Sequence, residues 1–485
     1  MSPIDLLVVA PLAFMILAIL AGNRASWLVP AILPVMAALS VWLVLLPHDA
    51  AHVVGGWELP LGILLRADGI ARLMVPAATV CFLAVGLYAR SELLPGPGGG
   101  SARSQTFWPM MYLMWAGTNA GFLTTDLFNL YVAIEMVSLA AVAMAALGSL
   151  QAALRYFLIA LVGSLAYLMG VALLFANYDT VDTTLLAGIG RPDLATRFAL
   201  AVMTAGLLIK AALFPLHGWL PPAHAAAPAP ASALLSAIVV KLGFVILVRL
   251  WFEAFPESAG FAVMHLLGGM GALAVLYGSA QAMRQDRLKP LVAYSTVAQI
   301  GYLFLAFPLV AGAQDPSGAW AGMMLHGVAH MLAKAAMFLA AGLMLKAAHG
   351  DRIADLVGLA RAMPITVTAF GLAAVSLMGL PPSGGFTAKF LLLQAAIEQG
   401  AAVYAAVLVI GGLMAAIYLF RPLAVAFSGS DMPAVETGAP LRAAAPLALA
   451  VIAIALGFAG AAAVDLLVAA SPWATEAPSL PEAVQ

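Results

Sequence analysis

The sequence contains few charged residues. Lys, Arg, Asp and Glu together make up 9% of the 485 residues, whereas 64% are hydrophobic, and the mean hydropathy is +1.04. A soluble domain carries about 25% charged residues, so this composition excludes a soluble globular protein. The apolar runs have the length of a membrane-spanning helix, about 20 residues, whereas a barrel strand needs only about 9–11. The sequence therefore predicts an all-α polytopic membrane protein, because helices satisfy their own backbone hydrogen bonds in lipid.

Cysteine is nearly absent as well. The single cysteine, Cys81, lies in an apolar run, which excludes an internal disulfide and a cysteine-ligated cluster. The net charge is −1 and no basic cluster occurs, so we expect no nucleic-acid partner. No nucleotide-binding loop is found either, and we expect no cofactor and no metal. The N-terminus carries no basic group, so we interpret residues 4–22 as a first membrane span rather than a secretory signal.

Fourteen apolar stretches are candidates for membrane spans. They lie at 4–22, 27–47, 70–90, 107–124, 127–148, 153–176, 197–219, 229–252, 261–281, 290–311, 318–346, 363–390, 401–421 and 443–470. An even number of spans places both termini on the same side of the membrane. The count therefore predicts which of the charged residues lie on the same side of the membrane.

When both termini are placed on the outer side, most of the basic residues fall on the inner side of the membrane. The inside then holds Arg24, Arg90, Arg103, Arg155, Arg284, Arg287, Lys289, Lys346, Arg352, Arg361, Arg421 and Arg442. The outside holds Arg66, Arg72, Arg191, Arg197 and Arg249. Such an excess of inside cations is what the positive-inside rule requires. We therefore expect a multi-pass protein of the cell (inner) membrane with outer termini.

The spans and loops divide the chain into five segments. These are an N-terminal three-helix segment (1–92), a first five-helix repeat (107–252), a second five-helix repeat (261–421), a C-terminal helix (443–470) and a tail (471–485). The tail is rich in proline and alanine and is expected to be disordered. The outer loop 48–69 predicts a short hairpin, and the glycine-rich inside loop 93–106 is expected to be flexible.

Two spans are interrupted by prolines. These are Pro215, Pro221 and Pro222 in the seventh span and Pro381 and Pro382 in the twelfth. Proline removes a backbone donor and breaks a helix. Both breaks contain Leu-Pro-Pro, and they lie five spans apart, so the second copy would be inverted relative to the first. Paired broken helices indicate an inverted-repeat transporter.

Five charged residues lie inside the apolar stretches: Glu135, Lys210, Lys241, Lys334 and Lys389. A charge at membrane depth costs about 2.5–3.5 kcal/mol on insertion scales, so such residues usually serve a function. A lysine held away from water can lose its proton and pass one on. A Glu135–Lys210 ion pair that opens and closes would act as a switch. These residues therefore indicate a proton pathway.

Each of these charges also has a structural alternative. Glu135 could reach the lipid headgroups, or form a static pair with Lys210 that fixes helix packing. Lys241 could extend to the membrane surface. Lys389 could bind backbone carbonyls freed by the break in the twelfth span.

Three further polar residues follow one another along the eleventh span. His326, His330 and Lys334 are spaced i, i+4 and i+8, which places them along one side of a helix. Histidine titrates near neutral pH, so this row could carry protons. The alternatives are metal or haem ligation by the two histidines, and polar contacts that join helices. For His217, His224 and His265, a core or water-lining role remains equally open.

The sequence resembles the antiporter-like membrane subunits shared by respiratory complex I, Mrp-type cation/proton antiporters and membrane-bound hydrogenases. The resemblance covers roughly residues 70–425. Its motifs are Asp126-Leu-Phe-Asn-Leu-Tyr-Val-Ala-Ile-Glu135, Lys210-Ala-Ala-Leu-Phe-Pro-Leu-His-Gly-Trp-Leu-Pro-Pro-Ala-His224, Ala229-Pro-Ala-Ser-Ala-Leu-Leu235 leading to Lys241, Leu288-Lys-Pro-Leu-Val-Ala-Tyr-Ser295 with Gln299-Ile-Gly-Tyr302, His330 to Lys334, and Gly379-Leu-Pro-Pro382 to Lys389. The stretch after Pro222 departs from the family in being unusually rich in alanine.

The resemblance implies a fold of fourteen helices with two inverted five-helix repeats. It also implies a role for each matching residue: Glu135 and Lys210 as the coupling pair, Lys241, His326, His330 and Lys334 as the central relay, and Lys389 as the terminal lysine. Within the family the chain looks closest to the Mrp D-type subunit. The implied partners are other membrane subunits, including related antiporter-like chains, with protons, Na⁺ or K⁺ as transported ions and lipid around the protein.

The leading functional interpretation is a proton-translocating subunit of a multi-subunit monovalent cation/proton antiporter, which is no enzyme by itself. One alternative is a proton-pumping N- or M-type subunit of a complex I-like NADH-quinone oxidoreductase or of a membrane-bound hydrogenase. A second is a stand-alone secondary transporter of a small solute. A third is a structural subunit with a vestigial pathway.

Overall fold

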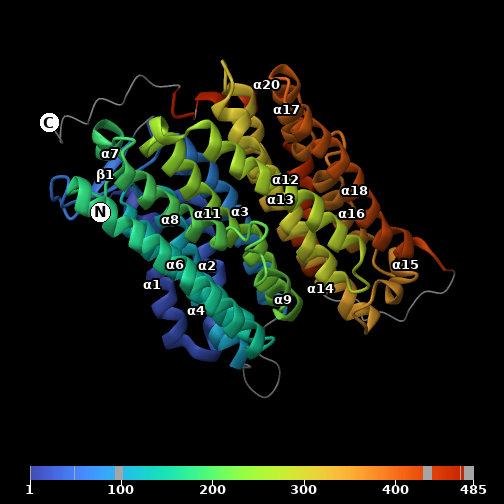
Figure 1. Cartoon of the computed structure of the whole chain (residues 1–485). Coiled ribbons are helices and arrows are strands. Elements are labelled where there is room, and N and C mark those ends of the chain that lie inside the picture. The colour runs from blue at the N-terminus through green and yellow to red at the C-terminus, as the bar shows by residue number, and fades with distance from the viewer. Residues whose placement is uncertain (1, 48–49, 93–101, 430–439, 470, 474–485) are drawn as a thin grey trace.

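The computed structural model describes residues 2–47, 50–92, 102–429, 440–469 and 471–473. Nearly all of these residues are helical. The helices of the first half of the chain lie on one side of the molecule and those of the second half on the other (Figure 1). The predicted helical membrane fold is therefore confirmed in its general form.

The elements of the first half begin at the N-terminus and end with the segment that carries Lys241. They are α1 (Pro3–Ala21), the 3₁₀ helix η1 (Gly22–Leu28), α2 (Val29–Leu45), β1 (Ala51–Val54), β2 (Ile63–Arg66), α3 (Gly69–Glu92), α4 (Ala102–Leu123), α5 (Leu127–Ala146), α6 (Leu150–Tyr178), α7 (Thr183–Ile189), α8 (Leu194–Lys210), α9 (Leu220–Ala226), α10 (Ala229–Leu234), the π-helical η2 (Leu235–Val239), α11 (Val240–Val248) and the π-helical η3 (Arg249–Ala254).

The described part of the second half contains eleven further helical elements. They are η4 (Pro256–Ser258), α12 (Phe261–Met283), α13 (Leu288–Ala311), α14 (Ser317–Ala348), η5 (Ile353–Leu356), α15 (Leu359–Ala362), α16 (Pro364–Met378), α17 (Gly384–Glu398), α18 (Ala402–Phe427), α19 (Pro440–Ala455) and α20 (Gly460–Ala469). Among the described residues, nine helical stretches are long and apolar enough to cross a membrane. The predicted count of fourteen spans and the inverted repeats stay predictions.

Two of the expected spans differ from the helices that the structure contains. The twelfth span was expected to end at 390, but α17 continues to Glu398, because no glycine or proline interrupts it before Gly400. The expected single span 443–470 consists of two helices, α19 and α20. Gly457 lies between them against Ser383, where an added Cβ would come within 2.5 Å of the Ser383 carbonyl carbon. This close contact fixes the turn between the two helices.

Two expected loops fall partly outside the described residues. Of the loop 93–106, residues 102–106 already belong to α4, and 93–101 lie outside the described part of the chain. Of the tail 471–485, only Ser471–Trp473 are described, and the Trp473 ring lies 5.1 Å from that of Trp320. The predicted hairpin in the loop 48–69 is confirmed as β1 and β2, which pair antiparallel with Ala51 opposite Arg66.

The hairpin lies on the turn between α4 and α5. The Thr125 amide donates to the Leu64 carbonyl oxygen at 3.1 Å, and Leu65 pairs with Thr124. Asp126 then begins α5 as its N-cap, accepting from the Asn129 amide at 2.6 Å. The hairpin therefore contacts the turn that begins α5, the helix that carries Glu135.

Helix α14 lies between the two halves. It is almost wholly buried, and it packs against α10 and η2 from the first half and against α13, α16 and α17 from the second. His326, His330 and Lys334 are on this helix. Its position therefore places them at the junction of the two halves.

Gly206 of α8 is expected to tolerate no larger side chain. An added Cβ there would lie 2.3 Å from the carbonyl oxygen of Gly163 on α6. Small residues let membrane helices approach each other this closely. Gly206→Val should lower the free energy of unfolding by about 1–3 kcal/mol, because the two helices must separate. The measurement is thermal unfolding of the purified protein. The control is Gly269→Val on α12, where an added Cβ meets no described atom within 4 Å; equal losses in both variants would contradict the prediction.

Candidate ion pathway

Glu135 and Lys210 form an ion pair in which the lysine is buried and the glutamate is partly exposed. Lys210 is the last residue of α8, and its Nζ lies 3.4 Å from Glu135 Oε1 on α5. Lys210 Nζ also donates to Ser138 Oγ at 2.9 Å, and the Ser164 hydroxyl of α6 donates to the same Glu135 oxygen. The proposed pair is thus present, and three helices hold it. Both a switching and a static role are compatible with this geometry.

The chain leaves the helix directly after Lys210. Residues 211–219 form turns that contain Pro215, and α9 then begins with Pro221 and Pro222 in its first turn, where a missing amide hydrogen costs no helical bond. The Trp219 indole stabilises the break by donating to the Ile209 carbonyl oxygen at 2.9 Å. The break leaves the Lys210 end of α8 without the rigidity of a continuing helix.

Lys241 lies at the centre of a continuous helical segment, 229–254, with π-helical turns on both sides. Its Nζ donates to the Ser236 carbonyl oxygen at 2.7 Å, which lies in η2, and its side chain is fully buried. It therefore does not extend to the membrane surface, as one alternative required. Gly243 lets α11 approach the first ion pair, since an added Cβ there would lie 3.1 Å from Lys210 Cβ. π-helical turns occur frequently at functional sites.

The three polar residues of α14 face the second half of the chain. Lys334 Nζ donates to the Val292 carbonyl oxygen at 2.9 Å and to the Ser295 hydroxyl, and a ring nitrogen of His326 lies 3.1 Å from the Gln299 carbonyl oxygen. The rings of His326 and His330 are stacked with centroids 5.9 Å apart. Neither ring nitrogen of His330 has a hydrogen-bond partner among the described residues.

Lys389 lies beside the second break. Its Nζ donates to the carbonyl oxygens of Leu377 at 2.7 Å and Met378 at 3.4 Å, at the end of α16, and lies 4.2 Å from the centre of the Tyr302 ring. The break itself contains Pro381 and Pro382. The carbonyl contact considered as an alternative is therefore present. It also fixes the ammonium group next to the interrupted backbone.

His330 lies one turn after His326 on α14, is buried, and stacks on the His326 ring. The structure therefore shows the Glu135–Lys210 pair, the stacked histidines and the buried side chains of Lys241, Lys334 and Lys389. Their connection into one pathway stays a prediction. Among the described residues, no group of three or more His, Cys, Asp or Glu side chains is placed to hold a metal ion.

His224 lies beside α14, which the sequence did not indicate. Its ring is fully buried on α9 and stacks on Phe338 of α14, with the ring centroids 4.7 Å apart. Both ring nitrogens lack a partner among the described residues. By contrast, His217 packs against Phe214 and Tyr277, and a ring nitrogen of His265 lies 2.8 Å from the Tyr404 hydroxyl.

A cavity of about 480 Å³ lies next to α9, at the junction of the two halves. It is lined by the alanine-rich stretch 225–229 and by charged residues that include Arg103, Lys289 and Lys346. Lys289 Nζ donates to the Ala227 carbonyl oxygen at 2.6 Å. The cavity opens on the side that the charge distribution predicts to be inside.

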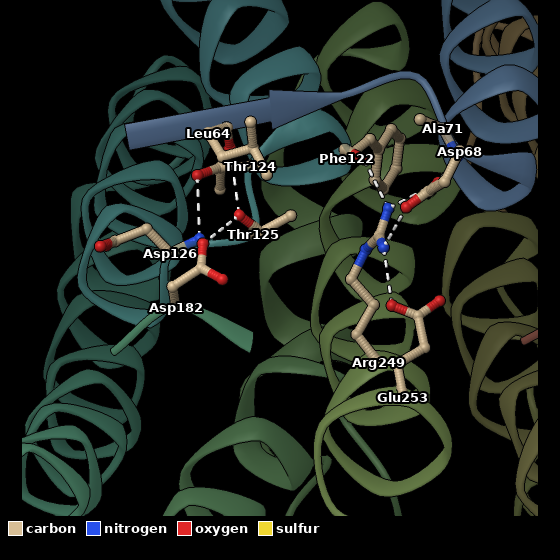
Figure 2. Close-up of polar contacts among 10 residues, drawn as sticks. All are labelled: Leu64, Asp68, Ala71, Phe122, Thr124, Thr125, Asp126, Asp182, Arg249 and Glu253. Carbon is tan, nitrogen blue, oxygen red and sulfur yellow. Dashed lines mark hydrogen bonds and ion pairs between the residues drawn. The ribbon is translucent and has the colours of Figure 1, made fainter. Parts of the chain in front are cut away.

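Arg249, which was counted among the outer charges, is buried inside the protein. It is the first residue of η3, its side chain is 2% exposed, and it forms an ion pair with Asp68 at 2.6 Å (Figure 2). Pairing with a buried carboxylate lets an arginine remain inside the protein. The i, i+4 spacing of Arg249 and Glu253 is a local signal for their own contact at 2.9 Å, but not for the pair with Asp68.

These features define a polytopic membrane protein with buried lysines and histidines in both halves of the chain. The chain belongs to the family described as NADH:quinone oxidoreductase/Mrp antiporter, TM, whose model matches residues 124–415. The resemblance noted from the sequence is therefore confirmed.

Individual relatives carry two kinds of names. The chain is 38% identical over 400 residues to the N-type subunit of NADH-quinone oxidoreductase from Desulforudis audaxviator, covering 80% of this chain and 78% of the relative. It is 29% identical over 386 residues to the D-type subunit of the Na(+)/H(+) antiporter from Alkalihalophilus pseudofirmus, covering 78% and 76%. Its fold matches a chain of the Mrp complex from Dietzia sp. with a TM-score of 0.87, at 24% identity and over 96% of each chain.

Proposed function

We propose that this chain is a proton-translocating subunit of a multi-subunit membrane complex. Protons would move along Glu135, Lys210, Lys241, the His330–Lys334 pair and Lys389. The observation that carries the proposal is the set of buried lysines and histidines together with the Glu135–Lys210 ion pair, because ionisable groups inside apolar helices cost free energy that a purely structural core would avoid.

The first ion pair would control the central lysine. While Lys210 binds Glu135, the carboxylate offsets its positive charge. When the pair opens, that charge faces the α11 segment, which approaches Lys210 at Gly243. Like charges in a medium of low polarity repel strongly, so Lys241 would release its proton toward α14. Opening and closing the pair would thereby drive one proton step.

The imidazole of His330 suits the central transfer. A buried polar nitrogen needs a hydrogen-bond partner, and internal water commonly supplies one. A water bound there would lie among Lys241, Lys334 and His326. The cavity beside α9 would admit protons from the inside through His224, and Lys389 at the second break would exchange them at the other end.

Two complexes fit this role. The D-type interpretation, as part of a monovalent cation/proton antiporter, is supported by the relatives named as D-type antiporter subunits. The N-type interpretation, as part of a redox-driven quinone oxidoreductase, is supported by the 38% identity to an N-type subunit. In either case the chain would lie in the cell membrane, with both termini outside and other membrane subunits packed around it.

Transport by everted vesicles that carry the whole gene cluster distinguishes the two complexes. For the antiporter, adding Na⁺ or K⁺ should dissipate a preformed pH gradient without any electron donor. For the redox-driven complex, the same vesicles should stay silent with cations and acidify only when a donor is supplied. Vesicles silent under both conditions, with the complex assembled, would contradict the proposed function.

A further inference from the structure

A second buried ionic cluster lies at the end of the membrane segment that carries Lys241. Arg249 Nη1 donates to Asp68 Oδ2 at 2.6 Å and Nη2 donates to Asp68 Oδ1 at 3.0 Å. Nη2 also donates to the Phe122 carbonyl oxygen of α4 at 2.8 Å. Figure 2 shows the guanidinium group between these partners. The cluster thereby ties η3 to the start of α3 and to the end of α4.

Glu253 competes with Asp68 for the same guanidinium nitrogen. Arg249 Nη1 donates to Glu253 Oε2 at 2.9 Å as well as to Asp68. The two carboxylate oxygens that share this nitrogen can be no farther apart than the sum of these two hydrogen-bond distances. Two carboxylates this close repel each other where water is scarce, so the protonated form of one of them is favoured.

The two carboxylates are not equivalent. Asp68 binds both guanidinium nitrogens and accepts from the Ala71 amide at 2.9 Å, as the N-cap of α3. Burial raises the pKa of Asp68, but the charge and hydrogen bonds of Arg249 outweigh it, and the pKa lies below its usual value. Glu253 has one bond to Arg249, and its side chain is 23% exposed against 8% for Asp68. Its second carboxylate oxygen is turned away from the guanidinium (Figure 2). Glu253 is therefore the carboxylate that can take up a proton.

The neighbouring charged groups are few. Arg66, on β2, lowers the pKa of Asp68 as Arg249 does. The negative charge that faces Glu253 is that of Asp68, since both carboxylates bind Nη1 of Arg249. Helix α7 also packs against η3, and its N-cap Asp182 is occupied by the Thr125 hydroxyl at 2.6 Å and by amides of its own first turn. The balance at Glu253 therefore depends on Asp68, Arg249 and Arg66.

We propose that Glu253 is a proton-binding site that responds to the pH on its own side of the membrane, predicted to be the outside. The proposal rests on the proposed function. A proton from that aqueous phase binds to the carboxylate oxygen that is turned away from Arg249. The product is a neutral carboxylic acid, and no bond other than this O–H bond is formed. Protonation weakens the hold of Glu253 on Arg249, leaving Asp68 and Phe122 as its partners. The segment that carries Lys241 is thereby less firmly fixed at low outer pH.

The test compares the outer-pH dependence of transport in right-side-out vesicles for the wild type, Glu253→Gln and Glu257→Gln. Glutamine mimics the protonated acid, so Glu253→Gln should lose the response to outer pH, or shift it by about one pH unit. Glu257 is exposed on η4, close by in the chain, so its variant should follow the wild-type profile. A Glu253→Gln profile equal to that of the wild type overturns the proposal. An equal shift in Glu257→Gln also overturns it, because surface charge would then explain the effect.

An infrared titration of the purified complex keeps the proposal testable even if no transport is measured. The carbonyl band of a protonated carboxylic acid should appear as the pH is lowered, and it should be missing in Glu253→Gln but present in Glu257→Gln. Glu253→Asp, which retains a carboxylate, serves if the glutamine variant fails to assemble; its band should be shifted relative to the wild type. A band unchanged in every Glu253 variant overturns the site whether or not the proposed function holds.

Discussion

Lys210→Met is expected to lower proton translocation by about two orders of magnitude, the scale of a positioned proton-transfer group. The variant removes the cation that binds Glu135 and Ser138, while the methionine side chain still fills the space at the end of α8. The measurement is the initial rate of vesicle acidification, or of gradient dissipation, normalised to assembled complex. The control is Arg284→Met, which removes an exposed cation between α12 and α13.

The partner variant shows whether the pair acts as a unit. Glu135→Gln should reduce transport to a similar degree, and the double variant with Lys210→Met should lose little more than either single variant. Independent effects that multiply would indicate separate roles. Full transport by assembled Lys210→Met would remove this residue from the pathway.

Arg249→Ala is expected to destabilise the protein by about 3–5 kcal/mol, because it leaves the buried Asp68 and the partly buried Glu253 without their shared cation. The measurement is thermal unfolding of the purified complex. The control is Arg197→Ala, which removes an exposed arginine at the start of α8. An unfolding temperature equal to that of the wild type would contradict the prediction.

A combined variant identifies the cause of this loss. Arg249→Met together with Asp68→Asn and Glu253→Gln removes every charge of the hydrogen-bonded cluster at once. It should regain much of the stability lost in Arg249→Ala, because no buried charge is left unpaired. If the combined variant is no more stable than Arg249→Ala, the packing of the arginine side chain rather than its charge is responsible.

The sequence predicted the helical membrane fold and the family because both depend on patterns that are local in the chain. Long apolar runs define helices in lipid. Charges inside those runs are rare enough to be noticed one by one, which is how Glu135, Lys210, Lys241 and Lys389 were found. Prolines marked the two breaks in the same way. The structure pairs Glu135 with Lys210 and buries Lys241 and Lys389, which their spacing alone did not require.

Contacts between distant segments were not predictable in this way. Asp68 and Arg249 lie 181 residues apart, so nothing in either neighbourhood indicated a pair. A charge near the end of an apolar run is compatible with an exposed position as well as with a buried ion pair, and Arg249 was counted only as a charge of the outer side. The π-helical turns beside Lys241 depend on how the whole segment packs, and the sequence there is typical of an ordinary helix.

The single cysteine makes the native chain a convenient starting point for labelling experiments. Cys81 is fully buried in α3, where a polar maleimide in the water phase cannot reach it. Any cysteine introduced at an exposed loop position would then be the only thiol that such a reagent modifies, and the unaltered protein serves as the blank. Labelling loop by loop from each side of sealed vesicles would map the number of membrane crossings and the side of each terminus without first removing a native residue.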